Sequence, residues 1–379
     1  MGIRGFQKFV NSVAPELFIK LNNLSRLNRN RNRFDSSDSS DSGVTVGVDV
    51  SIYIHQFCHG QRGLIKGNYL IKFLEMVNIF KRSNIKPIFV FDGAKPSGKQ
   101  NTINQRKQVK ERKLNQKIEY EKLYIQTGDK KYLQAKKELE GKMVHITGDM
   151  YGKLKNMFNI AGIPYIQAKG EADGILAELS KSKIVDYVIS DDIDLLVYGT
   201  SNLIRSFISK NKIIVKLEQL LERLDITLRQ FRQMAILAGC DYLNKILSLE
   251  DSYNYIISAE NSSEFDLFEL ECVTPHREKV LEILNMYENT ADDFEIIRPE
   301  LDIFRLKVYL KMNTDSNLYY LNRLISNLPS PSPSSASSDS SSGSWRSPVS
   351  PVYQRSWRNS PSDISNENPS RLIMVSEGK

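Results

Sequence analysis

Three aspartates follow a short apolar segment, and residues of this type at this spacing could support metal chemistry. The segment is Tyr187–Ile189, and Asp191, Asp192 and Asp194 stand within the four positions 191–194. In an open α/β sheet, reactive groups lie in the crevice beyond the carboxyl ends of the strands. Carboxylates this close repel one another, and a divalent cation offsets the repulsion. Taken alone, the segment fits an Asx turn between two buried strands equally well.

Further carboxylates occur where strands or helices are predicted to begin or end. The β-branched run Val44–Val50 predicts a buried strand that ends at Asp49. A second predicted strand, Lys86–Gly93, closes on Asp92. Acids also stand at one predicted helix start, where the helix dipole alone would favour them, and after one predicted helix end. The candidate metal ligands are Asp49, Asp92, Glu171, Asp173, Asp192, Asp194 and Asp241.

The chemistry of this set points to a hard cation. Each acid alone has an ordinary structural explanation, but together they form an oxygen-ligand set with no His or Cys among its members. Such a set suits Mg²⁺ or Mn²⁺ and not Zn²⁺. Two ions about 4 Å apart could activate water and stabilise the leaving oxygen in phosphodiester hydrolysis. The sequence has no Walker-type GKS/T loop, which argues against an activity driven by nucleotide hydrolysis.

A basic stretch follows the strand that closes on Asp92. Residues 99–142 are predicted to be helical and contain 13 Lys and Arg against 6 Asp and Glu. A solvated pair of charged helices would explain this composition. The alternative is a basic arch that brings a phosphate backbone to the acids. Each residue that favours the arch lies three, four or seven positions from another residue of the set. The set is Lys99, Arg106, Lys107, Lys110 and Lys113.

Composition sets the class of protein. The 379 residues are 40% hydrophobic, which is enough for one large core or two smaller ones. The net charge of +7 weakly favours polyanionic binding partners. Three cysteines without metal-site spacing predict a reducing compartment. No apolar run reaches the 18 residues of a membrane span, and the start of the chain lacks a signal-peptide pattern. We therefore expect a soluble intracellular protein.

Local patterns predict several other elements. We expect early helices within residues 1–24 and a helix over 51–60 from which Tyr53, His55 and Phe57 project. The stripe from Leu70 to Phe80 predicts a helix packed on the sheet. Two more helices, over Met143–Phe158 and Leu217–Ala238, and an edge strand at Ile213–Val215 are also predicted.

Composition divides the chain into segments. An Arg, Ser and Asp-rich insert and a Ser/Pro-rich tail with Ser-Pro dipeptides predict disorder, and the tail could carry phosphorylation sites or a binding motif. The predicted segments are an N-terminal part of the main domain (1–24), the insert (25–43), two further parts of that domain (44–98 and 143–242), the basic arch (99–142), a helical C-terminal region (243–328) and the tail (329–379).

The motifs together resemble a known family, the flap endonuclease and xeroderma-pigmentosum-G-type (XPG/Rad2) structure-specific 5′ nucleases. They run in the family's order over residues 1–242. The motifs are M-G-I-R-G-F, V-D-V-S-I-Y-I-H-Q-F, K-P-I-F-V-F-D-G, A-K-G-E-A-D-G, S-D-D-I-D-L-L-V-Y-G and L-A-G-C-D-Y.

The resemblance implies an α/β, PIN-like fold, in which helices flank a mostly parallel sheet and a helical arch and a C-terminal helical region are added. It also implies two Mg²⁺ ions, replaceable by Mn²⁺. Asp92, Glu171 and Asp173 would lie around one ion, and Asp192, Asp194 and Asp241 nearer the other. Asp49 completes the set, and Asp92, Glu171 and Asp192 are the acids expected to act directly in catalysis.

The resemblance also implies contacts with nucleic acid. Lys99 and Arg106 match the family's basic pair that steers the scissile phosphate. His55 falls where the family stacks a side chain on the terminal base, and Gly2 matches the small residue that approaches the substrate. Lys107, Lys110 and Lys113 extend the basic surface.

The sequence departs from the family pattern in three places. After Tyr242 the glycines of the helix-hairpin-helix that grips downstream duplex and a monovalent cation are absent, which puts substrate preference in doubt. The tail has no sliding-clamp peptide, so we expect no clamp partnership, although the tail could bind another partner. The insert at 25–43 is unusual as well, and a divergent, viral member of the family would fit.

The function predicted from these features is metal-dependent cleavage of flapped, branched or nicked DNA during replication, repair or recombination, by a monomer. A 5′→3′ exonuclease or junction resolvase fits the same residues. The sequence is also compatible with a catalytically silent scaffold for nucleic-acid or protein binding, and with an RNA-directed nuclease. We expect a nuclear location, with a cytoplasmic viral replication site as the alternative.

Overall fold

The computed structural model covers most of the chain in detail. It describes residues 3, 5–31, 43–60, 63, 65–94, 100–143, 145–258, 267–289 and 293–328, without side chains for 29–31, 100–106 and 269. The predicted tail at 329–379 and most of the predicted insert lie outside the described residues. Among the described residues, no helix combines the length and apolar character that crossing a bilayer would require.

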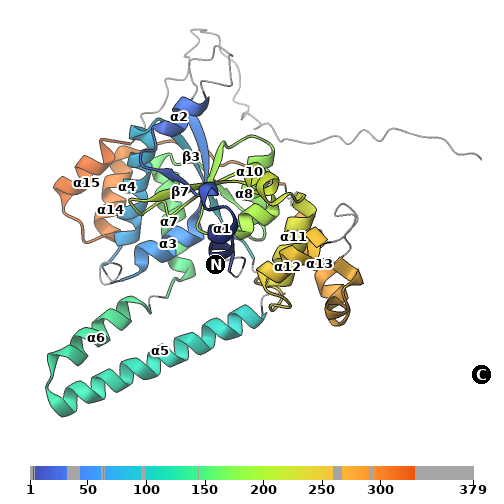
Figure 1. Ribbon diagram of the computed structural model, residues 1–379. Helices are drawn as coiled ribbons and strands as arrows, with labels where there is room; N and C mark the ends of the chain where they lie inside the picture. The colour runs from blue at the N-terminus through green and yellow to red at the C-terminus, as the bar shows by residue number, and fades with distance from the viewer. Residues whose placement is uncertain are drawn as a thin grey trace, which may run out of the picture. The chain divides into compact units, whose positions relative to one another are not determined.

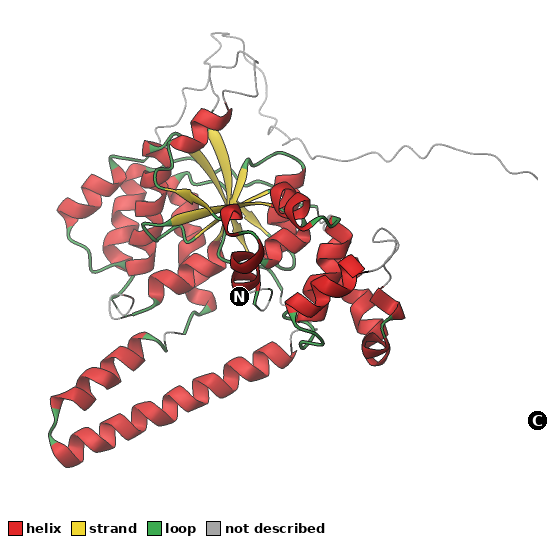
Figure 2. Cartoon of the chain, viewed as in Figure 1, coloured by secondary structure: helices red, strands yellow, loops and turns green. Residues whose placement is uncertain are grey.

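A mostly parallel sheet is the framework of the fold (Figures 1 and 2). Its seven strands run in the order β1-β7-β6-β5-β2-β3-β4. The five strands from β6 to β4 are parallel to one another, β7 runs antiparallel to them, and β1 pairs antiparallel with β7. The strands are β1 (Ile19–Leu21), β2 (Val44–Asp49), β3 (Ile85–Phe91), β4 (Tyr165–Gln167), β5 (Tyr187–Ile189), β6 (Asn202–Arg205) and β7 (Lys212–Lys216). The predicted mostly parallel sheet is therefore confirmed.

The central strands are buried on both faces, as parallel strands are. Val48 and Phe89 point into one hydrophobic cluster, and Ile88 and Val90 point into the other. Gly47 permits a close approach from the helix above it, because a Cβ there would lie 3.0 Å from Leu176 Cδ2. The sheet is thus held between two layers of helices.

One helical layer covers the face toward Val48 and Phe89. It contains α3 (Val50–Cys58), α4 (Asn68–Arg82), α7 (Gly148–Ala161), α14 (Ile303–Asn313) and α15 (Leu318–Ile325). Tyr53 and Phe57 lie in this core, so the prediction that they project was wrong, while His55 is exposed. The reason is helical periodicity: Tyr53 and Phe57 are four residues apart and share the face that packs on the sheet.

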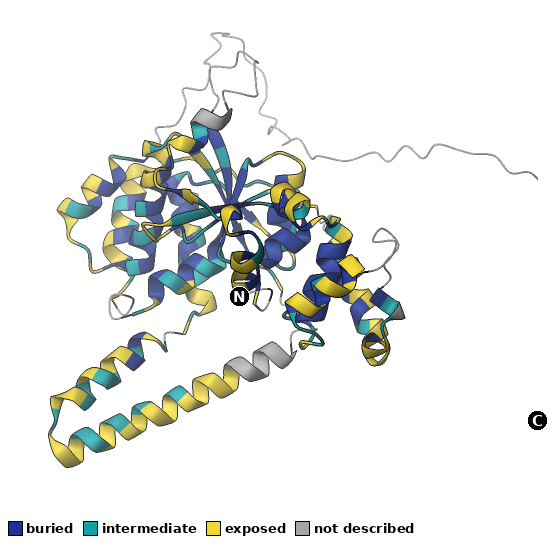
Figure 3. Cartoon of the chain, viewed as in Figure 1, coloured by how far each residue is buried: buried dark blue, intermediate teal, exposed yellow. Residues whose placement is uncertain are grey.

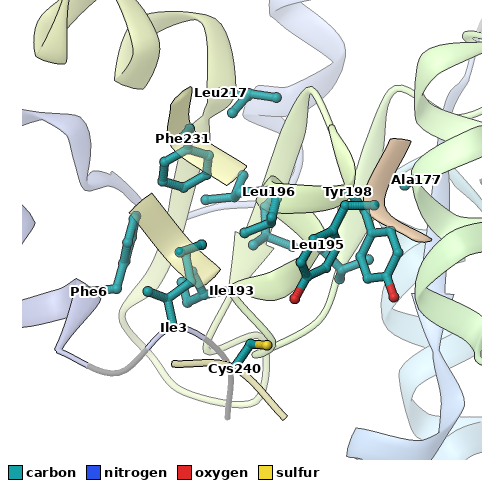
Figure 4. Packing of buried hydrophobic residues seen from close by; sticks show 14 of the residues in the cluster. Ile3, Phe6, Ala177, Ile193, Leu195, Leu196, Tyr198, Leu217, Phe231 and Cys240 are labelled. Atoms are coloured by element: carbon teal, nitrogen blue, oxygen red, sulfur yellow. The ribbon is translucent and has the colours of Figure 1, made fainter. Parts of the chain in front are cut away.

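The other layer covers the face toward Ile88 and Val90. It contains α1 (Phe6–Val13), α8 (Ala172–Lys181), α9 (Asp194–Tyr198), α10 (Leu217–Leu224), α11 (Leu228–Ala238), α12 (Leu249–Ser258) and α13 (Arg277–Glu288). Figure 4 shows Leu195, Leu196 and Tyr198 of α9 among side chains from several of these elements. Figure 3 shows the resulting buried interior between exposed outer helix faces.

The basic stretch forms two helices. α5 (Gln100–Thr127) and α6 (Lys130–Gly141) pack against each other as a hairpin (Figure 1). Asp129 caps α6 by accepting a hydrogen bond from the Lys131 amide at 2.9 Å. The end of α6 is tied to the domain, because the Gly60 amide donates to the Gly141 carbonyl at 2.8 Å. The stretch is therefore largely helical, as predicted, and its role as an arch stays a prediction.

Three local predictions need correction. Residues Arg26–Arg31 form helix α2 with Leu27 buried, so this part of the predicted insert is ordered by an apolar anchor. β7 is not an edge strand, because β1 pairs with it on the outside. α7 begins at Gly148, where Thr147 accepts a hydrogen bond from the Met150 amide and caps the helix.

Candidate metal centre and nucleic-acid interface

Asp49 stands at the end of the central strand β2 and at the start of α3. Its Oδ1 accepts hydrogen bonds from the amides of Ser51 at 2.9 Å and Ile52 at 3.3 Å, and its Oδ2 accepts from Ser190 Oγ at 2.9 Å. The side chain is 4% exposed. Burial, followed by the charge of Asp92, raises the pKa of Asp49 to about 7, although the Ser190 bond lowers it. A buried carboxyl is therefore held beside other carboxyls at the strand ends.

Asp92 follows β3, the neighbour of β2, and is joined to the start of α8. Its Oδ1 accepts a hydrogen bond from the Ala172 amide at 2.8 Å, and its Oδ2 accepts from the Ser51 hydroxyl. Gly93 lets this turn pack closely, since its amide donates to the Gly170 carbonyl at 2.6 Å. A Cβ at Gly93 would lie 2.2 Å from the Ala168 carbonyl oxygen. The close turn thus fixes Asp92 against the residues that precede Glu171.

Glu171 and Asp173 open α8, as predicted. Glu171 is the N-cap residue, but its side chain accepts no capping hydrogen bond from the helix. Its Oε2 instead accepts a hydrogen bond from the Tyr242 hydroxyl, which comes from the loop after α11. Burial raises the pKa of Tyr242, so the phenol stays protonated and acts as a donor.

Asp173 shows that these carboxyls lie close together. Burial raises the pKa of Asp173 well above its usual range. The negative charges of Asp192 and Asp49 raise it further, and Glu171 and Asp92 contribute in the same direction. The structure therefore brings together acids from the ends of β2, β3 and β5 and from the start of α8. A site with this much negative charge favours a cation or a proton.

The two aspartates that begin the central triplet have different surroundings. Asp191 accepts hydrogen bonds from Gln56 Nε2 at 2.6 Å and from the Ser206 amide at 2.5 Å, so it braces α3 and the loop after β6. Asp192 accepts from the Asp194 amide at 3.1 Å, and its own amide donates to Ser190 Oγ at 3.1 Å. Asp191 thus has a bracing role, and the role of Asp192 as a site residue stays a prediction.

Asp194 and Asp241 lie on the side of the site toward α11. Asp194 is the first residue of α9 and is 6% exposed. Burial raises the pKa of Cys240, and the negative charge of Asp194 raises it further. Asp241 follows Cys240 in the loop after α11 and is half-buried. This loop folds back through Gly239, whose φ of 92° suits glycine. The tight turn therefore places Asp241 directly after Cys240, the residue whose pKa the charge of Asp194 raises.

The donor set fits a divalent metal in its chemistry. The expected ligands are carboxylate oxygens, and burial, followed by nearby like charges, raises the pKa of Asp49 and of Asp173. As they stand, however, the described side chains contain no group of three or more His, Cys, Asp or Glu that could hold a metal ion. Instead, three hydroxyl groups donate hydrogen bonds to carboxylate oxygens of the acids. The donors are Ser51, Ser190 and Tyr242.

The predicted nucleic-acid contacts are described only in part. Gly2 and Lys99 lie outside the described residues, and Arg106 lies in α5 without a described side chain. Lys107 and Lys110 are exposed on α5. Lys113 Nζ donates to the Lys142 carbonyl at 3.4 Å, across the hairpin. The roles of these residues and of exposed His55 stay predictions.

Sequence reasoning missed the hydroxyl groups that surround the acids. Ser51, Ser190 and Tyr242 each donate to a predicted ligand, and Tyr151 OH lies 3.1 Å from Ser51 Oγ. Ser190 directly precedes the triplet and Tyr242 directly follows Asp241, so proximity in sequence was an available signal. Tyr151 had no such signal, because its contact depends on how α7 packs.

Two family models match the chain. The XPG N-terminal domain matches residues 1–113, and the XPG I-region matches residues 162–241. These ranges include all of the predicted acids. The unmatched residues between the two ranges include most of the α5–α6 hairpin.

Individual proteins are similar to the chain over a comparable range. "Flap endonuclease 1" of Cryptosporidium parvum is 30% identical over 282 residues, covering 67% of this chain and 53% of that protein. "Flap endonuclease 1" of Babesia bovis is 26% identical over 344 residues, covering 86% of this chain and 48% of that protein. The chain spans about half the length of the curated relatives it matches.

Solved structures share the fold. Flap endonuclease-1 from Methanococcus jannaschii has a TM-score of 0.55 at 21% identity, covering 76% of this chain and 92% of that one. Human GEN1 in complex with Holliday junction DNA has a TM-score of 0.60 at 16% identity, covering 86% of this chain and 77% of that one. The predicted PIN-like fold is confirmed by such likenesses. The two matching family models and the flap endonuclease relatives show that the chain is a member of the XPG/Rad2 flap endonuclease family.

Proposed function

We propose that this chain is a divalent-metal-dependent, structure-specific 5′ nuclease that hydrolyses phosphodiesters in flapped or branched DNA. The observation that carries the proposal is that Asp49, Asp92, Asp173 and Asp192 interact with one another at the strand ends and the start of α8, where burial, followed by their charges, raises the pKa values of Asp49 and Asp173. Family membership supports DNA as the substrate class, because relatives named flap endonuclease and structures in complex with DNA share the sequence motifs or the fold.

In this proposal the acids hold two ions, Mg²⁺ or Mn²⁺. Glu171, Asp173 and Asp92 would bind one, and Asp192, Asp194 and Asp241 the other. Bound ions would supply a nucleophilic hydroxide and stabilise the leaving oxygen. The chain's own groups orient the ligands: Ser190 holds Asp49, Ser51 and the Ala172 amide hold Asp92, and Tyr242 holds Glu171.

The basic hairpin supplies the second part of the proposal. Lys107 and Lys110 present exposed ammonium groups on α5, which begins eight residues after Asp92. Ammonium groups attract phosphates without reading sequence. We assign Lys99 and Arg106 the role of steering the scissile phosphate, and His55 a contact with the terminal base. DNA replication, repair or recombination would supply such substrates, with a monomer acting in the nucleus or at a viral replication site.

The test is cleavage of a 5′-end-labelled flap duplex in Mg²⁺ by wild type and by Asp192→Asn. Cleavage near the branch by wild type, and none by the variant, is the expected result. Nicked and junction substrates on the same gel distinguish a flap nuclease from an exonuclease or a junction resolvase. Folded wild-type protein that leaves all these substrates intact in Mg²⁺ and Mn²⁺ would overturn the proposal in favour of a silent scaffold. Cleavage of single-stranded RNA alone would assign the site to RNA.

A further inference from the structure

We propose that Tyr242 is a positioning residue for Glu171, and that Tyr198 holds Tyr242 in place. This inference rests on the proposed function, because it concerns how one of the metal-binding acids is oriented. It assigns a role to two tyrosines that the set of acids and basic residues leaves unused.

The contact between Tyr242 and Glu171 joins two distant parts of the chain. Tyr242 lies in the loop after α11 and is 8% exposed, and its hydroxyl donates to Glu171 Oε2, 71 residues earlier. A carboxylate has two oxygens, so Glu171 can accept from Tyr242 through Oε2 and present Oε1 to a cation. The tyrosine thereby selects which oxygen faces the site.

Glu171 needs such a partner more than Asp49 does. Asp49 caps its own helix through the Ser51 and Ile52 amides, which fixes its carboxylate locally. Glu171 occupies the same N-cap position on α8, but its side chain accepts no capping hydrogen bond. Its longer side chain has one more rotatable bond, so its direction depends on contacts from elsewhere in the fold.

Tyr198 provides the support behind Tyr242. The two phenol groups lie close enough to influence each other's pKa. Tyr198 is 5% exposed, and its ring packs edge-on against Tyr287 of α13, with centroids 4.8 Å apart and ring planes at 76°. Figure 4 shows the Tyr198 side chain packed within this cluster. α9 and α13 thus fix the ring that supports the donor to Glu171.

The experiment measures Mn²⁺ binding to the DNA-free protein by electron paramagnetic resonance, beside cleavage of the flap duplex. Tyr242→Phe removes one hydroxyl and keeps the ring. We expect it to weaken Mn²⁺ binding by about tenfold, because groups that orient metal ligands contribute on this scale. The KM for DNA is expected to stay unchanged while kcat falls. Tyr198→Phe is expected to cause a smaller loss in the same direction.

Two further variants separate positioning from a general structural effect. Tyr253→Phe in α12 is the matched control, since it removes a hydroxyl that donates to the Leu224 carbonyl at 3.1 Å. It is expected to bind Mn²⁺ as wild type does. In a Glu171→Gln background, Tyr242→Phe is expected to add little further loss. Thermal unfolding midpoints in EDTA verify that each variant is folded, and if Tyr242→Phe does not fold, the Tyr198→Phe result decides.

The outcomes separate this inference from the proposed function. Wild-type Mn²⁺ affinity in folded Tyr242→Phe, or an equally large loss with Glu171→Gln already present, would overturn the positioning role. If wild type binds Mn²⁺ but cuts no DNA, the proposed function fails while the Mn²⁺ titrations still decide the role of Tyr242. If wild type binds no Mn²⁺, both fail together.

Discussion

The Ser190 hydroxyl donates to Asp49 Oδ2 at 2.9 Å and thereby joins the ends of β5 and β2 across 141 residues of sequence. The Ser190 hydroxyl oxygen also accepts a hydrogen bond from the Asp192 amide at 3.1 Å. Ser190 has no exposed surface, so its hydroxyl is not in contact with bulk water. One hydroxyl therefore sets the relative positions of two proposed metal ligands.

Replacing Ser190 tests this relationship. Ser190→Ala leaves a buried carboxylate oxygen without its donor, which is expected to lower the free energy of unfolding by about 1–3 kcal/mol. Urea unfolding measures the change. Ser182→Ala is the control, because Ser182 donates to Glu178 on an exposed helix end and its loss is expected to cost under about 0.5 kcal/mol. Equal effects of the two substitutions would contradict the role of Ser190.

Asp49 predicts how stability depends on pH without metal. Its pKa rises from 3.8 to about 7 on folding, chiefly through burial and then through Asp92. Between these values the folded state holds a proton that the unfolded state has released, so stability falls as pH rises toward 7. In EDTA at pH 8, Asp49→Asn is therefore expected to be more stable than wild type, by on the order of 2 kcal/mol.

The same comparison at lower pH provides the check. The advantage of Asp49→Asn is expected to shrink as pH falls and to disappear near pH 4. Asp302→Asn is a matched control, because Asp302 also caps a helix, accepting from the Arg305 amide at 2.9 Å, but is exposed. A wild type that is the more stable protein at pH 8 would refute the raised pKa.

Neighbouring Asp191 and Asp192 are expected to fail in different ways. Asp191→Ala removes the acceptor of two hydrogen bonds, so we expect a loss of about 1–3 kcal/mol in unfolding free energy with Mn²⁺ binding retained. Asp192→Asn is expected to lower cleavage by roughly a hundredfold or more while the fold stays stable. Urea unfolding and the flap assay on both variants give the comparison. Loss of Mn²⁺ binding in folded Asp191→Ala would make that residue a ligand.

Gly93 is expected to tolerate no side chain. A Cβ there would overlap the Ala168 and Lys169 carbonyl oxygens at 2.2 Å, so Gly93→Ala must displace the turn that carries Asp92. We expect a loss of stability of about 1–3 kcal/mol and a larger loss of cleavage. Gly170→Ala is the control, because a Cβ at Gly170 meets nothing within 4 Å. Similar stabilities of the two variants would show that the turn can relax.

The exposed lysines of α5 are expected to contribute through charge alone. Replacing Lys107 and Lys110 by Ala is expected to weaken binding of all DNA sequences similarly. The slope of log affinity against log salt is expected to fall by roughly 1–2, since each phosphate contact contributes about 0.7–0.9. Lys72→Ala on α4 is the control, because Lys72 pairs with Glu75 at 2.7 Å. A double variant with an unchanged salt slope would exclude α5 from the DNA interface.

Much of this protein was readable from sequence because the signals are local. Runs of β-branched residues such as Val44–Val50 form strands wherever both faces are buried, and acids at the ends of parallel strands meet at one edge. The helical period of α4 and the charge pattern of α5 and α6 likewise depend on neighbours in the chain. The strand ends and the set of acids followed from these patterns, while the fold class followed from the resemblance of the motifs to a known family.

Tertiary structure gave chemically similar residues different structural roles. Asp191 and Asp192 are adjacent and chemically identical, yet Gln56 and the Ser206 amide bind one while the other remains with the acids, because β6 and α3 approach on only one side. Tyr53 is buried by packing, and β1 covers the side of β7 that was expected to be an edge. Hydroxyl donors to the acids come from up to 141 residues away. Contacts between distant segments depend on how helices pack on the sheet, which no local pattern encodes.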